Sequence, residues 1–314
     1  MDVAVTGGTG FIGRQLVSHL LARGDRIRLL TRRPAALPGF PDSVKVFAGD
    51  LACGDVDLRP FVADVDVLFH CAGEIRDARH MRALHVAGTE RLIQAASGKI
   101  GHWVQLSSTG AYGKVRTGVV TEESAVAPEN EYERTKTDSD ALVSAAAGPA
   151  TFSATILRPS NVFGPTMSNR SLFQMIAMIS RGIYFFMGPP GVSANYIDVD
   201  NVVEAMLGCA TLPQARGQTF ILSDHRSLED FVAAIAHSLG RPAPRLRVPE
   251  QFARMSAAIF RAMPGFPLTA SRVDALTDRV VYSAQHIGRT LNYVYSVSME
   301  DGVDRVVQSW RQRQ

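Results

Sequence analysis

The stretch Val3-Ala4-Val5-Thr6-Gly7-Gly8-Thr9-Gly10-Phe11-Ile12-Gly13 decides the fold of this chain. An apolar strand runs into glycines at 7, 10 and 13, and an amphipathic helix follows over 14–23, closed by Gly24. Such glycines permit a tight strand-to-helix turn and let the backbone approach a pyrophosphate, whose charge then lies at the positive end of the helix dipole. The stretch predicts a dinucleotide site formed by Gly7, Thr9, Gly10, Phe11, Ile12 and Gly13.

Strands and helices alternate through the first half of the chain. Apolar strands are predicted at 3–6, 27–30, 44–47, 67–70, 103–107 and 154–158. This alternation favours parallel βαβ units in a doubly wound sheet with helices on both faces. We expect an α/β fold in which residues 1–165 and 196–224 form a parallel Rossmann domain. Residues 166–195 and 225–314 are expected to form a smaller, mixed C-terminal substrate lobe.

Two helices of the lobe have clear sequence signals. Ser227, with Asp230 three residues later, predicts a capped helix that ends at Gly240. Residues 299–310 carry Val303, Val306, Val307 and Trp310 at helical spacing, which predicts a helix packed into the core.

A tyrosine and a lysine lie four residues apart, at Tyr132 and Lys136, in a segment with a helical pattern. This spacing places both side chains on one face of a helix. A phenol has a pKa of about 10, and a cation beside it lowers that pKa toward neutral pH. The pair is therefore suited to exchange a hydroxyl proton while a hydride moves.

The Gly-x-x-Gly-x-x-Gly spacing, with Thr6 before it and Phe11-Ile12 within it, resembles the extended short-chain dehydrogenase/reductases, the NAD-dependent epimerase/dehydratase family. In that family a tyrosine and a lysine four residues later carry the chemistry. The resemblance implies that Tyr132 is the acid/base, which contacts both cofactor and substrate. It also implies that Lys136 tunes the phenol and holds the nicotinamide ribose.

A hydroxyl-rich segment follows the strand predicted at 103–107. Family members carry a serine or threonine four residues before the tyrosine of a Tyr-Gly turn, and counting back from Tyr112 gives Ser108. The resemblance implies that Ser108 binds the substrate by a hydrogen bond to the reacting oxygen and stabilises charge that develops there. Ser107 and Thr109 are the alternatives, for which local capping of the strand end is the simpler interpretation.

Further segments along the chain carry the same resemblance. It implies cofactor contacts from Asp50 and Leu51 on the adenine side, from the small-residue turn Cys71, Ala72 and Gly73, and from Pro159. Segments 157–165 and 196–203 resemble the passage into the substrate lobe and the return from it. His85 stands where relatives have an asparagine, and its role is left open.

The end of the second predicted strand bears on the choice of cofactor. NAD-preferring relatives place a carboxylate there to bind the adenosine ribose, but this chain has Thr31 followed by Arg32 and Arg33. An arginine pair can bind a 2′-phosphate, so we expect NADP(H) rather than NAD. The alternative is that both arginines belong to an ordinary solvated loop.

The sequence supports more than one substrate class. The first hypothesis is a nucleotide-activated sugar, converted by an epimerase or a keto-sugar reductase, with Asn161 as a substrate contact. Sugar-nucleotide relatives carry an arginine two residues before the aromatic of the returning strand, where this chain has Ala194. Arg272 is the expected replacement for binding the diphosphate, with Arg170 and Arg181 as alternatives.

Two other functions are also compatible with the sequence. The runner-up is an NADPH-dependent reductase of a non-sugar ketone, of the dihydroflavonol or hydroxysteroid type, which the segment 276–282 and the apolar helix before it favour. A third class is a non-catalytic NADP-binding sensor, against which the intact Ser/Tyr/Lys set argues.

Composition limits the remaining possibilities. The 314 residues carry a net charge of +3 that is spread along the chain, which gives no case for nucleic acid binding. Cys53, Cys71 and Cys209 form no metal-ligand or disulfide pattern, so no metal is expected. No apolar run reaches the ~18 residues of a membrane span, and we expect a cytoplasmic enzyme.

Two further expectations concern helical segments. The amphipathic segment 252–263 is expected to pack in the core of the lobe rather than touch a membrane. Relatives often form homodimers through the helices expected at 86–96 and 132–143, and the resemblance implies the same here.

Overall fold

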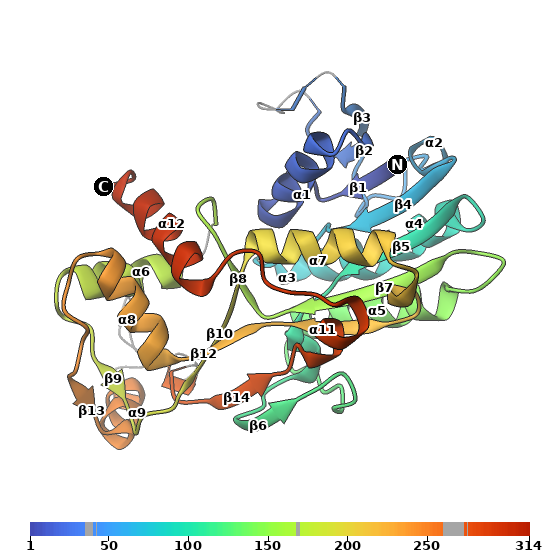
Figure 1. The fold of residues 1–314 in the computed structure, drawn as a ribbon. Coiled ribbons are helices and arrows are strands. Elements are labelled where there is room, and N and C mark those ends of the chain that lie inside the picture. The colour runs from blue at the N-terminus through green and yellow to red at the C-terminus, as the bar shows by residue number, and fades with distance from the viewer. Residues whose placement is uncertain (35–39, 42, 168–169, 260–272, 275) are drawn as a thin grey trace.

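A seven-stranded parallel sheet forms the centre of the protein (Figure 1). The computed structural model describes residues 1–34, 40–41, 43–167, 170–259, 273–274 and 276–314. In the order β11-β7-β5-β4-β1-β2-β3, the strands are Thr219–Leu222, Ser153–Pro159, Ile100–Leu106, Val65–His70, Asp2–Thr6, Arg26–Thr31 and Lys45–Ala48. The predicted doubly wound sheet is confirmed, and each predicted strand is present with its ends shifted by at most three residues.

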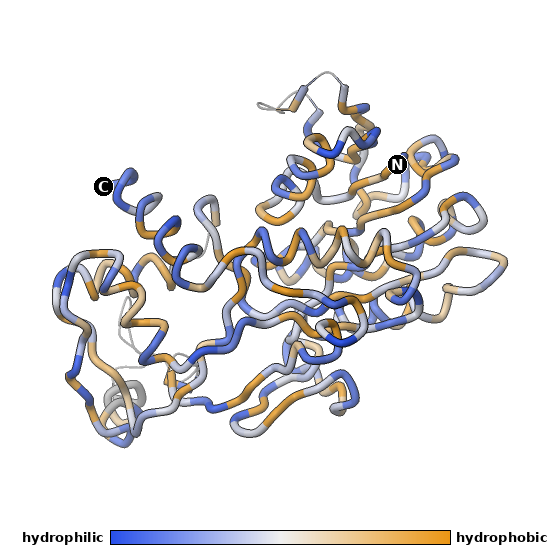
Figure 2. Tube along the Cα trace, in the orientation of Figure 1, coloured by the Kyte–Doolittle hydropathy of each residue, from blue (hydrophilic) through white to orange (hydrophobic). Residues whose placement is uncertain are grey.

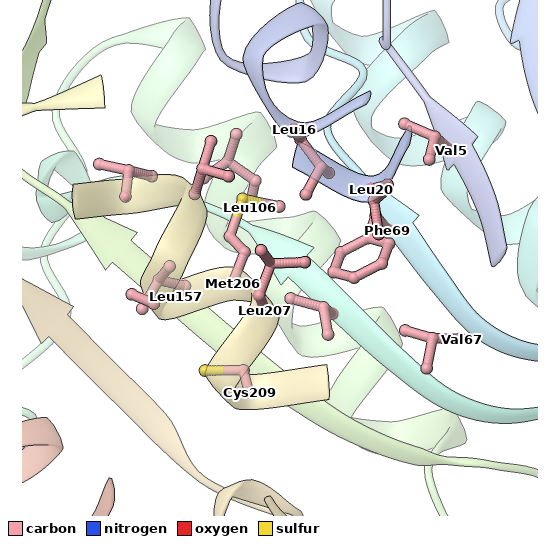
Figure 3. Packing of buried hydrophobic residues seen from close by; sticks show 14 of the residues in the cluster. Val5, Leu16, Leu20, Val67, Phe69, Leu106, Leu157, Met206, Leu207 and Cys209 are labelled. Carbon is pink, nitrogen blue, oxygen red and sulfur yellow. The ribbon is translucent and has the colours of Figure 1, made fainter. Parts of the chain in front are cut away.

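Helices cover both faces of this sheet. On one face lie α1 (Phe11–Ala22) and α7 (Val199–Thr211), and on the other α2 (Arg59–Val62), α4 (Gly88–Ala96) and α5 (Glu131–Ala146). Side chains of a strand alternate between its faces, so Val3 and Val5 pack with α1 and α7 while Ala4 packs with α4. Figure 3 shows Leu16 and Leu20 of α1 packed with residues of α7 and the sheet.

The rest of the chain forms smaller mixed sheets and their helices. The strands β8 (Asn161–Phe163), β10 (Ser193–Asp198) and β12 (Asp224–Ser227) form one sheet, β9 (Phe186–Met187) pairs with β13 (Arg247–Val248), and β6 (Thr117–Val120) pairs with β14 (Arg279–Tyr282). The helices here are α6 (Arg170–Ser180), α8 (Leu228–Ser238), α9 (Glu250–Ile259) and α12 (Met299–Arg311). Helix α11 (Gln285–Leu291) instead packs against β11 at the edge of the central sheet, with Ile287 in the same core cluster as α1 and α7. The smaller mixed lobe is therefore confirmed. Its exact boundaries stay a prediction.

The two helices of the lobe with clear sequence signals are present. Helix α8 begins after Ser227, whose side chain accepts from the Asp230 amide at 3.0 Å. Helix α12 buries Val303, Val306 and Val307 against α8, and Trp310 packs at the edge of the same cluster. Figure 2 shows the mixture of hydrophilic and hydrophobic residues along α12 that such a half-buried helix requires.

The prediction for 252–263 is wrong for Phe252 and Met255, the two apolar side chains of this segment that the structure describes. Phe252 and Met255 of α9 are 57% and 53% exposed, so this face of the helix does not pack in the core. The apolar spacing predicted the helix itself, but spacing alone does not say which face finds a partner. Residues 260–263 lie outside the described part.

Candidate active site

The glycines of the first turn are required by close backbone contacts. Gly7 has φ +69°, and a Cβ atom there would lie 2.5 Å from the Cys71 carbonyl carbon. At Gly13 a Cβ would lie 2.2 Å from the Gly7 carbonyl oxygen. No side chain caps α1 at Gly10, so the first helix amides are left for another acceptor. The turn therefore has the form of an anion cradle, which fits a dinucleotide pyrophosphate.

A cleft of about 440 Å³ opens in front of this cradle. Ten predicted cofactor residues line it: Gly7, Thr9, Gly10, Arg32, Arg33, Asp50, Leu51, Cys71, Ala72 and Gly73. Sequence reasoning missed Thr6, Arg14, Leu30, Thr31, Gly49 and Leu84, which also line it. Most of these flank the predicted residues along the chain, so reading the strand ends one residue further would have found them. The other six predicted cofactor residues do not line this cleft: Phe11, Ile12, Gly13, Tyr132, Lys136 and Pro159.

The two arginines after β2 lie at the rim of the cleft. Thr31 is buried, and its hydroxyl accepts from the Arg33 amide at 3.2 Å. The Arg32 side chain is 63% exposed, with its guanidinium 4.0 Å from the Asp50 carboxylate. Both residues line the cleft, where an arginine side chain can meet an anionic ligand.

Helix α5 positions Tyr132 in its first turn. Asn130 and Glu133 form a capping box, in which each side chain accepts from the other residue's amide. The Ser108 hydroxyl lowers the pKa of the Tyr132 phenol, and its oxygen accepts from the Gly110 amide at 3.1 Å. The structure thus brings the predicted Tyr132 and Ser108 together.

Ser107 and Thr109 do not occupy this position. The Ser107 hydroxyl donates to the Asp140 carboxylate at 2.7 Å, on the other side of the strand end. Thr109 is buried in the short turn η2 (Thr109–Tyr112). Of the three neighbouring hydroxyls, it is Ser108 that lowers the pKa of the Tyr132 phenol.

Lys136 follows Tyr132 by one helical turn and is buried. Its ammonium donates to the Leu106 carbonyl at the end of β5, and burial lowers its pKa while the Asp140 carboxylate opposes that effect. Burial also raises the pKa of Tyr132. The lowering of the phenol pKa by Lys136 that the motif predicts stays a prediction.

A buried ion pair lies beneath these residues, and sequence reasoning missed it. The Arg158 guanidinium donates to Asp140 Oδ2 from Nε and Nη2, both at 3.2 Å, and from Nη1 to the Tyr112 hydroxyl at 3.1 Å. Asp140 stands one turn beyond Lys136 on α5, so spacing on the helix could have suggested it. Its partner on β7 could not be found without the fold.

The predicted substrate residues are only partly described. Asn161 begins β8 and is exposed. Arg272 and the side chain of Arg170 lie outside the described residues, and Arg181 is exposed just after α6. Ala194 is 2% exposed, within the core of the lobe.

Two expected absences concern metals and membranes. Among the described residues, no group of three or more His, Cys, Asp or Glu side chains is arranged to hold a metal ion. No helix within those same ranges has the length and apolar character needed to cross a membrane.

The sheet order, the glycine turn and the contacts of Ser108, Tyr132 and Lys136 define a dinucleotide-binding oxidoreductase of the short-chain dehydrogenase/reductase type. Residues 3–222 match the family described as NAD dependent epimerase/dehydratase family. The chain belongs to this family, in the extended branch of those enzymes, as the sequence resemblance implied.

Individual relatives are similar over almost their full length. The chain is 25% identical to a UDP-glucose 4-epimerase of Vibrio cholerae, with 99% of this chain and 96% of the relative covered. It is 28% identical to a 4-hydroxy-2-methyl-3-oxo-4-farnesyl-3,4-dihydroquinoline-1-oxide ketoreductase of Stigmatella aurantiaca, over 98% and 96%. The structure of a UDP-glucuronic acid 4-epimerase from Bacillus cereus with NAD superposes with a TM-score of 0.76 at 18% identity, covering 100% of this chain and 99% of that one, which is a likeness of fold.

Proposed function

We propose that this enzyme catalyses reversible hydride transfer between NADP(H) and a secondary alcohol or ketone. The observation that carries the proposal is that Lys136, one turn beyond Tyr132 on α5, donates to the Leu106 carbonyl, two residues before Ser108. A hydroxyl and a phenol on segments joined in this way can both contact one substrate oxygen. The test is reduction of NADP, or oxidation of NADPH, by the wild type and by Tyr132→Phe. We expect the variant to lose this activity.

Each residue has a distinct role in this chemistry. Tyr132 gives the proton to the substrate oxygen in reduction and removes it in oxidation. Ser108 donates a hydrogen bond to the same oxygen and stabilises its negative charge. Lys136 holds the ribose hydroxyls next to the nicotinamide and places a positive charge below the site. The bound nicotinamide supplies the hydride acceptor or donor.

NADP is proposed over NAD because of the cleft rim. Arg32 and Arg33 line the cleft, and no carboxylate stands at the end of β2, where Thr31 is found. Arg14, which also lines the cleft, follows the glycine turn and adds positive charge near the phosphates. Guanidinium groups bind phosphate by charge-assisted, often bidentate hydrogen bonds.

For the substrate, we propose a nucleotide-activated sugar, handled by an epimerase or a keto-sugar reductase. The full-length similarity to a UDP-glucose 4-epimerase supports this class. So does Asn161, which is exposed two residues beyond Pro159 at the end of β7, with an amide that can both donate and accept. Arg272 stays the proposed ligand of the diphosphate.

A second candidate is an apolar ketone, and a specific observation favours it. Ala194 is buried in the core of the lobe, so the position where sugar-nucleotide relatives carry an arginine offers no charge to a diphosphate. The ketoreductase relative, whose name describes a farnesylated ketone, is also similar over its full length.

Calorimetric titration separates the two candidates. UDP, GDP and dTDP are titrated into the NADP-loaded protein and into Arg272→Ala. Binding of one nucleotide to the wild type supports a nucleotide-sugar substrate. Loss of that binding in Arg272→Ala supports Arg272 as the ligand of the diphosphate. Failure of all three at millimolar concentration rejects the sugar and leaves the apolar ketone. The homodimer and the cytoplasmic location stay predictions from the sequence.

A further inference from the structure

His85 connects two segments that meet at the site. It lies in the π-helical segment η1 (Ala83–Ala87) and is 1% exposed. Its Nε2 accepts from the Glu74 amide at 2.8 Å, directly after Gly73 in the cleft lining. Its Nδ1 lies 2.8 Å from the Thr135 hydroxyl, on the turn of α5 that carries Tyr132. One side chain therefore bridges the cofactor cleft and the catalytic helix.

The partners fix where the imidazole proton lies. A backbone amide is always a donor, so Nε2 must present its lone pair to Glu74. The neutral ring then carries its proton on Nδ1 and donates it to the Thr135 oxygen. Thr135 in turn donates to the Glu131 carbonyl at 2.8 Å. This hydrogen-bond chain is consistent throughout only with a neutral ring protonated on Nδ1.

We propose that His85 is a positioning residue that fixes the Gly73–Glu74 backbone relative to the first turn of α5. The inference rests on the proposed role of Tyr132. The His85 and Tyr132 rings meet edge to face, with centroids 5.9 Å apart and an interplanar angle of 80°. The imidazole thus limits rotation of the Tyr132 ring, while its Nε2 holds the Gly73–Glu74 backbone beside the cleft.

The surroundings keep His85 in the neutral form that this role needs. Burial lowers its pKa to about 3, the Lys136 ammonium acts in the same direction, and the Glu74 carboxylate opposes them. That carboxylate accepts hydrogen bonds from the amides of the next two residues, Ile75 and Arg76, at 2.9 and 2.8 Å. Protonation would turn Nε2 into a donor facing the Glu74 amide and would break the bridge.

His102 provides a matched control. It is also a buried histidine with two hydroxyl partners, Ser153 at 2.7 Å and Thr155 at 3.1 Å. It stands near the start of β5, at the opposite end of the strand from Ser108. His102→Ala removes a comparable set of contacts without touching the cleft.

Two measurements test the proposal. Calorimetric titration of NADP and NAD is expected to show about tenfold weaker binding of both in His85→Ala, which leaves the Glu74 amide without its acceptor. His85→Gln, whose amide can accept and donate at once, is expected to restore most of the affinity, and His102→Ala to bind as the wild type does. Equal losses in His85→Ala and His102→Ala, or no recovery with Gln, overturn the proposal.

The second measurement does not depend on the reaction. Imidazole ¹⁵N shifts at neutral pH, assigned by comparison with His85→Gln, are expected to show an unprotonated Nε2 and a protonated Nδ1. A ring protonated on Nε2 contradicts the bridge, whatever substrate the enzyme uses. If the tautomer and the affinities behave as expected but Tyr132→Phe retains turnover, the bridge stands and the proposed chemistry fails.

Discussion

Lys136 lies one turn beyond Tyr132 on α5, yet its ammonium donates to the Leu106 carbonyl, with 2.5 Å between Nζ and oxygen. Leu106 ends the strand that leads to Ser108, so this bond fixes the catalytic helix to the serine segment. The lysine therefore has a structural partner as well as its proposed ligand.

Replacing Lys136 tests both attachments. In Lys136→Met the helix loses this bond and the ribose loses its cation, so we expect weaker cofactor binding together with a fall in turnover of roughly 100-fold. Cofactor titration and initial rates measure the two effects. Lys114→Met is a suitable control, because that lysine pairs with Asp274 outside the cofactor cleft. Cofactor affinity unchanged in Lys136→Met would argue against the ribose contact.

Removing the phenol oxygen should separate chemistry from binding. Tyr132→Phe is expected to lower turnover by roughly 100-fold or more while cofactor affinity stays near that of the wild type, since it removes one hydroxyl from the proton path and no contact to the pyrophosphate. Tyr184→Phe, in the core of the lobe, is the matched control and should leave both unchanged. Single-turnover kinetics decide the matter, and normal hydride transfer in Tyr132→Phe would remove this residue from the mechanism.

The pH dependence should differ between the two directions of reaction. Burial raises the pKa of Tyr132 above its usual value of about 10, so the phenol is protonated at neutral pH. Reduction needs that proton, and its rate should stay level through neutral pH and fall as the phenol ionises. Oxidation needs the phenolate, and its rate should rise with pH. Initial rates in both directions check this, and reduction that accelerates at alkaline pH would contradict the assignment.

The arginine pair should set cofactor preference. Combining Arg32→Ala with Arg33→Ala removes the charged donors at the rim, and NADP affinity should fall by roughly 10- to 100-fold. NAD has no 2′-phosphate, so its affinity should change little. Calorimetry with both cofactors on both proteins measures this. Tighter binding of NAD than NADP to the wild type would show that the two arginines are ordinary solvated residues.

Two helical glycines should respond in opposite ways to alanine. At Gly13 the new Cβ would meet the Gly7 backbone at 2.2 Å, so the turn must shift and cofactor affinity should fall. At Gly208 in α7 nothing lies within 4 Å of the new Cβ. Gly208→Ala should therefore stabilise the protein by about 0.5–1 kcal/mol, the usual gain in a helix. Thermal unfolding and NADP titration of both variants make the comparison, and full NADP affinity in Gly13→Ala would show that the turn adapts.

Much of this arrangement could be predicted from the sequence because it depends on local spacing. The glycine turn, the strands and the Tyr132–Lys136 pair each follow from residues within a few positions of one another. Ser108 was found by counting from Tyr112, and its effect on the pKa of Tyr132 is in keeping with that assignment.

Other features depend on which distant segments the fold brings together. The Asp140–Arg158 ion pair joins α5 to β7, and the bridge through His85 joins three segments of the chain. Nothing in the local sequence around His85 distinguishes a structural bridge from a replaced asparagine. Phe252 and Met255 are a second example. Their apolar spacing predicted a buried helix face, but they are exposed, because the spacing does not reveal whether a partner is present.

The pairing of β6 with β14 constrains the order of events during synthesis. Arg279 pairs with Thr117, about 160 residues earlier, in the segment that follows the Ser108 and Tyr112 turn. While the chain is still emerging from the ribosome, the sheet and helix α5 can already form, but β6 has no partner. The loop that this pairing closes is among the longest in the molecule, and the entropy of closing it must be overcome late. The strand pair that packs against Tyr112 therefore forms only after Tyr282 has been translated.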